Sequence, residues 1–259
     1  SLADEGALAE AREILSAEFD AHLERQYLTC GRSQVGEPRL VAHSSSDHGA
    51  LVTLRRDLLS LLDYESGLFQ GFEPRYMEWD FGYGEDVVTY AGVRLKGTVD
   101  RLDVDAHGQA LIIDYKYRKA KGFEAEHDAL PGGDLAAGLV LPRHVQSLVY
   151  AQVVRRAFPD LKLRGSLYLC GRRAHALAGA VDENLVERVF GSHVPSRRRL
   201  ARLAVDRTAS FGRDDDAGMN ALLDACEELV AAKIERLLAG DIEPNPVDKN
   251  ACTYCPVLD

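Results

Sequence analysis

Apolar residues recur at helical spacing near the start of the chain. Between about residues 3 and 27 they stand three or four positions apart, at Leu8, Ala11, Leu15, Phe19 and Leu23. This is the period of one face of an α-helix. A second helix is predicted after the Ser-Ser-Ser-Asp at 44–47, because these residues favour the N-cap position. Its inward-facing leucines are Leu51, Leu54, Leu58, Leu61 and Leu62. We therefore predict a helical N-terminal segment over residues 1–72.

From about residue 76 to residue 117 the rhythm changes to the alternation of β-strands. The runs MEWDFG, VVTYAGVRLKGTVDRLDV and ALIIDYKY indicate strands, and AHGQ between the last two indicates a hairpin turn. A helix opening at Pro142, a strand in LKLRGSLYLC and a long helix from about residue 216 to 239 follow. This order predicts a single α/β domain, whose core over residues 73–259 holds a mixed sheet with a central antiparallel hairpin, flanked by helices.

Length and charge narrow the class of protein. The chain has 259 residues and is roughly half apolar, which suits a globular core. Its acidic, helical start differs from a signal peptide, and no apolar run approaches the roughly 20 residues of a membrane span, so we expect a cytoplasmic protein. The net charge of −10 opposes nucleic-acid phosphates, so phosphate binding depends on local basic runs. The candidate runs are Arg118, Lys119 and Lys121, and Arg197, Arg198, Arg199 and Arg202. A solvated charged face is the alternative for each.

The central hairpin carries charges where a buried strand would not. The stretch GTVDRLDVDAHGQALIIDYK, residues 97–116, has Asp100 on its first strand and Asp114 and Lys116 on its second, although isolated buried charges are costly. A two-residue turn at 107 and 108 would set Asp100 opposite Tyr115 and put the acids on opposite faces. A shift of one residue, for example through a three-residue loop with a glycine bulge, sets Asp100 opposite Asp114 or Lys116. Because only the shifted register makes a cluster, we predict it.

Two facing carboxylates indicate a metal site. They repel each other unless a divalent cation lies between them, and hard oxygen ligands on a rigid sheet favour Mg²⁺ or Mn²⁺. The carbonyl of Tyr115 is a further candidate ligand. Lys116 points to the same face as Asp114, where it can orient an attacking water or stabilise charge on a phosphate. These groups predict metal-assisted phosphodiester hydrolysis, and a solvated ion pair at a strand end is the alternative. Glu78 in MEWDFG is a weaker candidate for an accessory acid.

The ordered set GTVDRLD, IIDYK, QSLVY and a final CxxC resembles the PD-(D/E)xK nuclease superfamily, in particular the RecB-like branch at the C-terminus of AddB-type helicase-nuclease subunits. The resemblance covers roughly residues 73–259. It implies a restriction-endonuclease-like core, with Asp100, Asp114 and Lys116 as the metal-binding and catalytic residues. It also implies that Gln146 and Tyr150 form the family's Q-x-x-x-Y element. Four residues apart, these two side chains share a helical face and could contact a DNA phosphate or base. A polar helix face is the alternative.

The five cysteines are of two kinds. Cys30, Cys170 and Cys226 stand singly, which argues against a secreted disulfide framework. Cys252 and Cys255 form a CxxC pair, a spacing that suits chelation or redox chemistry but supplies only half of a four-thiolate site. The resemblance implies that this pair belongs to a four-cysteine iron-sulfur (4Fe-4S) cluster in a longer parent protein. Half of a zinc site is the alternative.

The sequence departs from the family pattern in two places. Family members carry on an early helix a histidine that completes the metal site, in a stretch resembling G-x-x-x-H-x-x-L. The best candidate here is His22 in FDAHLERQY, which lacks the glycine. The family places one cluster cysteine far upstream and three near the end, whereas this chain has two near its end and Cys30 as a further candidate. We therefore expect the chain to be a fragment of a longer protein.

Two functions compete on these residues. The first is a Mg²⁺-dependent exodeoxyribonuclease domain that acts on single-stranded DNA ends delivered by a helicase subunit or helicase-like domain, in double-strand break repair. The second is a catalytically inactive scaffold of the same fold that binds DNA or partner subunits. Retention of both acids and the lysine favours the nuclease, while the absent motif histidine and the net charge favour the scaffold. The sequence leaves open the polarity of cleavage and the choice between DNA and RNA.

Overall fold

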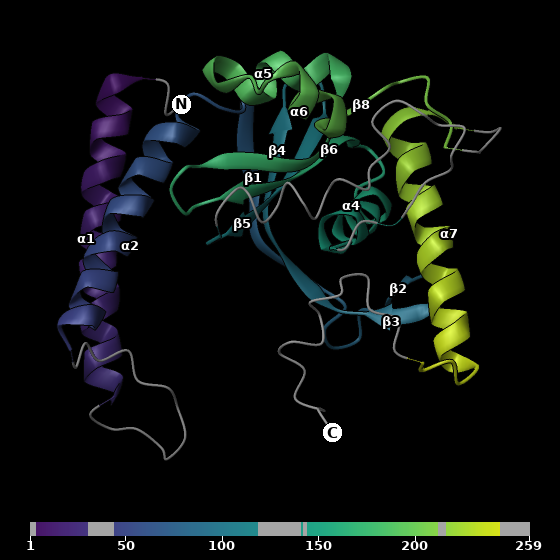
Figure 1. The fold of residues 1–259 in the computed structure, drawn as a ribbon, viewed down its shortest axis with the longest axis horizontal. Coiled ribbons are helices and arrows are strands. Elements are labelled where there is room, and N and C mark those ends of the chain that lie inside the picture. The colour runs from purple at the N-terminus through teal and green to yellow at the C-terminus, as the bar shows by residue number, and fades with distance from the viewer. Residues whose placement is uncertain (1–3, 31–43, 119–140, 142–143, 212–215, 244–259) are drawn as a thin grey trace.

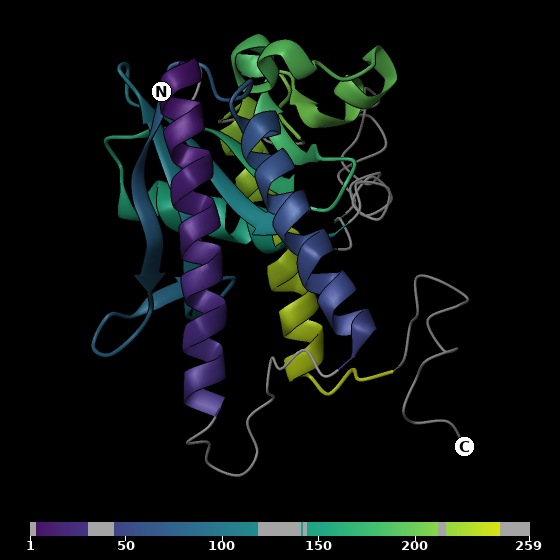
Figure 2. The ribbon, with the colours of Figure 1, turned by 90° about the vertical axis from the view of Figure 1, so that its left-hand side faces the viewer.

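Two long helices stand side by side at one flank of the molecule (Figures 1 and 2). The structure is a computed structural model that describes residues 4–30, 44–118, 141, 144–211 and 216–243. Helix α1 spans Glu5–Cys30 and helix α2 spans Ser45–Glu65, so both predicted N-terminal helices are confirmed. The predicted cap of the second helix is present, because the Ser44 side chain accepts from the Asp47 N–H and the Asp47 side chain accepts from the Ser44 N–H.

The centre of the fold is a six-stranded mixed sheet in the order β1-β4-β5-β6-β7-β8. Its strands are β1 (Phe72–Phe81), β4 (Gly97–Asp105), β5 (Gln109–Lys116), β6 (Lys162–Cys170), β7 (Ala176–Asp182) and β8 (Ala204–Val205). The pairs β5–β6 and β7–β8 are parallel and the others are antiparallel. A separate hairpin joins β2 (Val88–Tyr90) to β3 (Val93–Leu95). The mixed sheet with an antiparallel hairpin at its centre is therefore confirmed.

Helices cover both faces of this sheet and bury two hydrophobic cores. Helices α4 (Gln146–Ala157) and α7 (Gly218–Leu238) cover one face, while α2, α5 (Val186–Phe190) and α6 (Arg197–Leu203) pack on the other. Short 3-10 turns lie at Glu183–Leu185 and Gly191–His193. In β5, Ala110 and Ile112 face α4 and α7, and Leu111 and Ile113 face the opposite core. A strand buried on both faces reads as a continuous apolar run, as LII does here.

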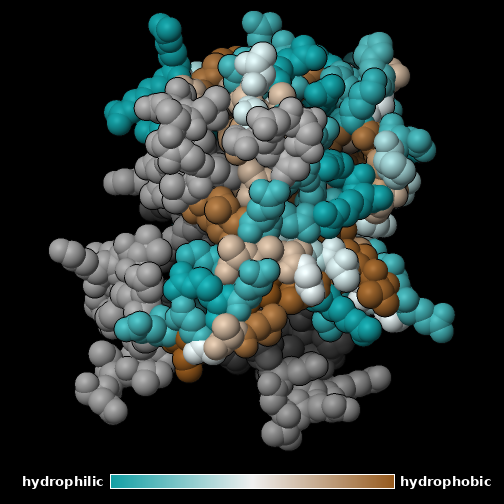
Figure 3. All heavy atoms as spheres, turned by 90° about the vertical axis from the view of Figure 1, so that its right-hand side faces the viewer, coloured by the Kyte–Doolittle hydropathy of each residue, from teal (hydrophilic) through white to brown (hydrophobic). Residues whose placement is uncertain are grey.

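The face of the molecule that carries α7 is mixed in character. Apolar side chains form small patches between polar ones there (Figure 3). Leu237 and Leu238, at the C-terminal end of α7, are 58% and 75% exposed. No helix among the described residues is long and apolar enough to cross a membrane.

The second half of the sheet differs from the sequence prediction. Strands β7 and β8 and the short helices α5 and α6 are absent from that prediction, and the helix expected to open at Pro142 begins at Gln146. Every residue of β7, ALAGAVD, is buried, so the strand shows no alternation of apolar and polar residues. Its Gly179 has φ of 113°, a conformation that glycine permits. Small residues buried on both faces give neither a strand nor a helix pattern.

Candidate active site at the β4–β5 hairpin

The turn of the β4–β5 hairpin sets the register that the site requires. Three residues, 106–108, connect the strands. Gly108 has φ of 73°, a left-handed conformation that favours glycine, and its N–H donates to the Asp105 carbonyl at 3.1 Å. Arg101 pairs with Ile113 in the resulting ladder. One step further along this register Asp100 stands opposite Asp114. The predicted shifted register is thus confirmed, and the simple two-residue turn is excluded.

Asp100, Asp114 and Lys116 come together at the end of this hairpin. The Asp100 Oδ2 accepts the backbone N–H of Tyr115 at 2.8 Å, so the Asp100 side chain continues the ladder in place of a backbone carbonyl. The Asp114 side chain is only 2% exposed, and its Oδ2 lies 2.5 Å from Lys116 Nζ. The Lys116 side chain is 29% exposed, so this lysine lies between the buried Asp114 carboxylate and the protein surface.

The electrostatics of Asp114 favour its pairing with a cation. Burial raises the pKa of Asp114 above its usual value, the nearby charge of Lys116 lowers it, and the charge of Asp100 raises it again, with a net upward shift. Two carboxylates with one lysine leave an excess of negative charge. A divalent cation bound between the two acids would remove that excess.

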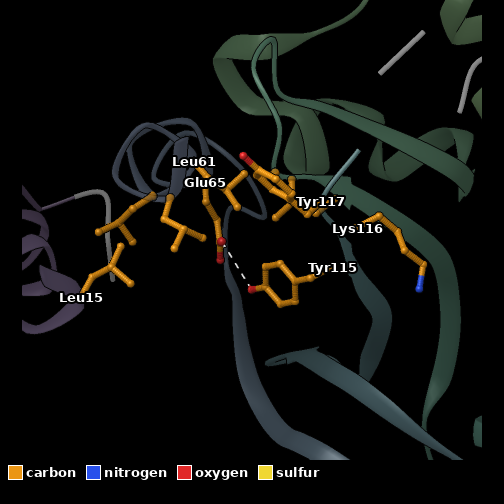
Figure 4. A pocket seen from close by; sticks show the side chains of 10 residues that line it. Leu15, Leu61, Glu65, Tyr115, Lys116 and Tyr117 are labelled. Carbon is orange, nitrogen blue, oxygen red and sulfur yellow. Dashed lines mark hydrogen bonds between the residues drawn. The ribbon is translucent and has the colours of Figure 1, made fainter. Parts of the chain in front are cut away.

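Tyr115, between the two site residues of β5, is anchored on the opposite face of the sheet. Its hydroxyl accepts from Arg101 Nη1 at 2.8 Å and lies 3.4 Å from Glu65 Oε2 of α2. Arg101 also pairs with Glu65 and donates two hydrogen bonds of 2.6 Å to Asp103. Burial and the charge of Glu65 raise the pKa of Tyr115 to about 12. In Figure 4 the Tyr115 ring points towards Glu65, whereas Lys116 leaves the strand in another direction.

This anchoring network was not predicted from the sequence. Arg101 and Asp103 lie two residues apart in a strand with apolar neighbours, so both had to share one face. That spacing was the available signal for a buried ion pair. An apolar pocket of about 380 Å³ adjoins the network (Figure 4). It is lined mainly by leucines of α1 and α2 and by Tyr115 and Tyr117.

Gln146 and Tyr150 lie on the α4 side of the sheet. Gln146 is exposed at the first residue of α4, and Tyr150, one turn later, is half-buried. The Tyr150 ring meets Phe81 edge-on, with 5.4 Å between centroids. A Cβ on Gly97 would lie 2.8 Å from both Tyr150 Oη and Phe81 Cζ. The glycine of the GTVD motif therefore lets Tyr150 approach the start of β4 closely.

The remaining sequence candidates do not complete a metal site in the described part of the chain. Glu78 is exposed on β1, stands opposite Asp100 by register, and has φ of 49°. His22 is exposed on α1. Within residues 4–30, 44–118, 141, 144–211 and 216–243, no three His, Cys, Asp or Glu side chains group so as to hold a metal ion. Among the described residues, the candidate metal site therefore consists of Asp100 and Asp114, with the Tyr115 carbonyl as the predicted third ligand.

The predicted cysteine and basic clusters lie largely elsewhere. Cys252, Cys255, Lys119 and Lys121 fall outside the described residues. Cys170 and Cys226 are both buried. The run on α6 lies on the face of the sheet opposite α4, where Arg199 donates to the Leu177 carbonyl at 2.8 Å. This run is therefore not part of the hairpin site.

Comparison with known proteins connects this geometry to a family. A sequence model of the PD-(D/E)XK nuclease superfamily matches residues 2–259. The chain belongs to this superfamily. It is also 25% identical over 188 residues to a subunit of the ATP-dependent helicase/deoxyribonuclease of Lactococcus lactis subsp. cremoris strain SK11. The identity is likewise 25%, over 196 residues, to the exonuclease/helicase subunit RexB of strain MG1363. Each match covers 64% of this chain and 16% of the relative, so the chain spans about a sixth of the length of these relatives.

Membership of the PD-(D/E)XK superfamily agrees with the fold and with the expected resemblance. The mixed sheet, its central antiparallel hairpin and the flanking helices are those of a restriction-endonuclease-like core. The superfamily is one of nucleases, and such hydrolases generally use divalent metal ions.

Proposed function

We propose that this chain is a metal-dependent DNA exonuclease domain, with Asp100, Asp114 and Lys116 as its catalytic residues. The observation that carries the proposal is the buried carboxylate of Asp114, held against Lys116 Nζ at 2.5 Å and next to Asp100 by register. A buried acid with a raised pKa beside a second acid is an unfavourable arrangement for stability alone. Its presence in a nuclease superfamily supports a catalytic role.

The residues of the site suit Mg²⁺ or Mn²⁺. Asp100 and Asp114 would supply two carboxylate ligands and Tyr115 its carbonyl, and water would fill the other positions, since these ions keep several waters. The fit rests on the donor chemistry, which is all oxygen, and on the uncompensated negative charge between the acids. When bound, such a cation lowers the pKa of water and neutralises charge on the phosphate.

The protein groups have distinct tasks in this scheme. Lys116, fixed by Asp114, donates hydrogen bonds to the attacking water or to a phosphate oxygen as negative charge grows there. Asp100 holds the Tyr115 backbone and so the geometry of the hairpin end. Gln146 and Tyr150, on the neighbouring helix, would contact the phosphate or base of the bound strand.

The relatives suggest the setting of the reaction. They are named as helicase and deoxyribonuclease or exonuclease subunits. We infer that this domain acts on single-stranded DNA ends delivered by a helicase subunit or helicase-like domain, in double-strand break repair. We also infer that Cys252 and Cys255 hold part of a 4Fe-4S cluster.

Two substitutions test the catalytic assignment. In the full chain, Asp114→Asn and Lys116→Ala should each lower Mg²⁺-dependent cleavage of labelled single-stranded DNA by roughly a hundredfold or more, because each removes a transition-state or metal contact. The matched controls are Asp160→Asn and Lys162→Ala, which alter exposed residues at the opposite end of β5 and β6 and should cleave as wild type does.

Other outcomes point to the alternative function. Cleavage at the wild-type rate by either site variant would exclude the site. DNA binding without cleavage by the wild-type chain, with Mg²⁺ and with Mn²⁺, would favour the inactive scaffold of the same fold.

A further inference from the structure

A buried tyrosine of β6, Tyr168, lies beside the carboxylate pair and belongs to none of the motifs above. It pairs with Asp114 across the parallel β5–β6 register, so the two side chains leave the sheet on the same face. Tyr168 is 1% exposed. A phenol oxygen buried this deeply normally has a hydrogen-bond partner.

That partner is the first turn of α4. The N-cap residue of this helix, Val145, has no side chain that can accept a hydrogen bond, so the first N–H groups of the helix need another acceptor. Tyr168 Oη accepts the N–H of Ser147 at 2.9 Å. A second β6 side chain, Ser166, donates from Oγ to the Ser147 carbonyl at 2.8 Å. Strand β6 thus fixes the turn that carries Gln146, and through it Tyr150.

The Tyr168 ring meets the catalytic lysine. Lys116 Nζ lies 5.8 Å from the ring centroid, within the range of a cation–π contact. The same ammonium lies 2.5 Å from Asp114 Oδ2. The lysine therefore rests between a carboxylate and an aromatic face, which limits the directions it can take.

We propose that Tyr168 is a positioning residue with two separable contributions. Its hydroxyl fixes the first turn of α4, and hence Gln146 and Tyr150, while its ring fixes Lys116 against Asp114. The kinetic consequences rest on the proposed nuclease function, whereas the contact with α4 does not.

Two variants separate the contributions. Tyr168→Phe keeps the ring and removes the oxygen, so KM for single-stranded DNA should rise about three- to tenfold, as expected for the loss of one helix-capping acceptor, with kcat changed less than about twofold. Tyr168→Leu removes both, so the same rise in KM should be joined by a fall in kcat of about tenfold. Retention of kcat by the phenylalanine variant distinguishes positioning of Lys116 from a general loss of structure.

Amide hydrogen exchange provides a measurement that does not depend on activity. Peptides covering residues 146–150 should exchange faster in Tyr168→Phe than in the wild type. The matched control is Tyr90→Phe. Tyr90 is also buried, at 3% exposure, and packs in a cluster with Val149 of α4, but its hydroxyl has no hydrogen-bond partner within the described residues. This control should leave both the exchange and KM unchanged.

Three results would overturn the proposal. Wild-type exchange and KM in Tyr168→Phe would remove the role of the hydroxyl. An equal fall of kcat in the phenylalanine and leucine variants would remove the role of the ring. If the wild-type chain cleaves no DNA, the proposed function fails, and unchanged exchange in Tyr168→Phe would then still overturn the contact with α4.

Discussion

One carboxylate, Asp105, holds the turn that determines the register of the site. Its Oδ1 accepts the N–H groups of His107 and Gln109, both at 2.9 Å. Its Oδ2 accepts from the Gln109 side chain at 2.8 Å and from Arg188 at 2.9 Å. These bonds favour the three-residue turn over a two-residue one. The position of Asp100 opposite Asp114 therefore depends on a residue outside the site.

We expect Asp105→Ala to destabilise the protein in a pH-dependent manner. Burial alone would raise the pKa of Asp105, but the hydrogen bonds from Arg188, Gln109 and His107 outweigh it and lower the pKa to about 2. A lowered pKa gives stability that is present above the ordinary carboxyl pKa and lost as the pH falls through about 2. The side chain is almost fully buried, so the loss at pH 7 should be on the order of 2 kcal/mol.

Urea unfolding at several pH values measures this contribution. The free energy of unfolding of Asp105→Ala should fall below that of the wild type by the full amount at pH 7, and this difference should shrink between pH 4 and pH 2. Asp160→Ala, at an exposed aspartate close to the same turn, should change stability by less than about 0.5 kcal/mol. A difference that stays constant down to pH 2 would contradict the assigned ionisation.

At the scale of elements, two ion pairs fix α2 with different strength. Glu65, at its C-terminus, pairs with Arg101 of β4, and both side chains are about nine-tenths buried. Asp63, also in the last turn of α2, pairs with Arg12 of α1, and both side chains are nearly half exposed. Breaking a buried pair leaves an uncompensated charge, whereas exposed pairs contribute little.

Glu65→Gln should therefore cost more stability than Asp63→Asn. We expect about 1–3 kcal/mol for Glu65→Gln, less than for an isolated buried pair because Arg101 keeps its two bonds to Asp103. Asp63→Asn should cost less than about 1 kcal/mol. Chemical denaturation of the two variants compares them directly, and equal losses would show that the Arg101 network does not anchor α2.

The elements that the sequence predicts well are those with a clear period or cap. The N-terminal helices have apolar spacing and a Ser44 cap, and the hairpin has two apolar-rich runs joined by a turn that contains Gly108. Strand β7 lacks both signals, because its small residues are buried on both faces. Contacts between elements that are distant in the sequence, such as the Glu65–Arg101 ion pair, could not be predicted either. No local sequence pattern indicates which charged residues will pair.

The same distinction holds within the site. Asp100, Asp114 and Lys116 stand out because charges interrupt an apolar hairpin, and their register follows from the turn. Tyr168 gives no such signal, since a tyrosine in an apolar strand is ordinary core composition. The proposed role of Tyr168 depends on the parallel pairing of β5 with β6 and on the packing of α4, which only the folded chain shows.

At the scale of the whole molecule, charge opposes the proposed substrate. The net charge of −10 repels DNA at long range, so binding depends on local cations and on the divalent ion. Delivery of the DNA strand by a helicase subunit or helicase-like domain, as proposed above, would help to overcome this repulsion.

The cysteine pair at residues 252 and 255 leads to a prediction about the proposed 4Fe-4S cluster. A CxxC pair supplies two of the four thiolates of a 4Fe-4S cluster. Cys226 is an unsuitable third ligand, because burial in α7 raises its pKa to about 12 and keeps the thiol protonated. Cys170 is likewise fully buried, in β6. We therefore expect the other ligands of the proposed cluster to be cysteines other than Cys170 and Cys226.

We expect an intact subunit of the relatives' length to contain iron that depends on this pair. Purified without oxygen, it should absorb visible light and hold about four iron atoms, and Cys252→Ser or Cys255→Ser should remove most of both signals. Cys226→Ala should leave the iron content unchanged, because Cys226 faces the hydrophobic core from helix α7. A colourless protein that contains zinc would replace the cluster with a zinc site. An iron content unchanged by both serine substitutions would show that the cysteine pair does not bind the cluster. Loss of iron in Cys226→Ala would show that this buried core thiol is a ligand after all.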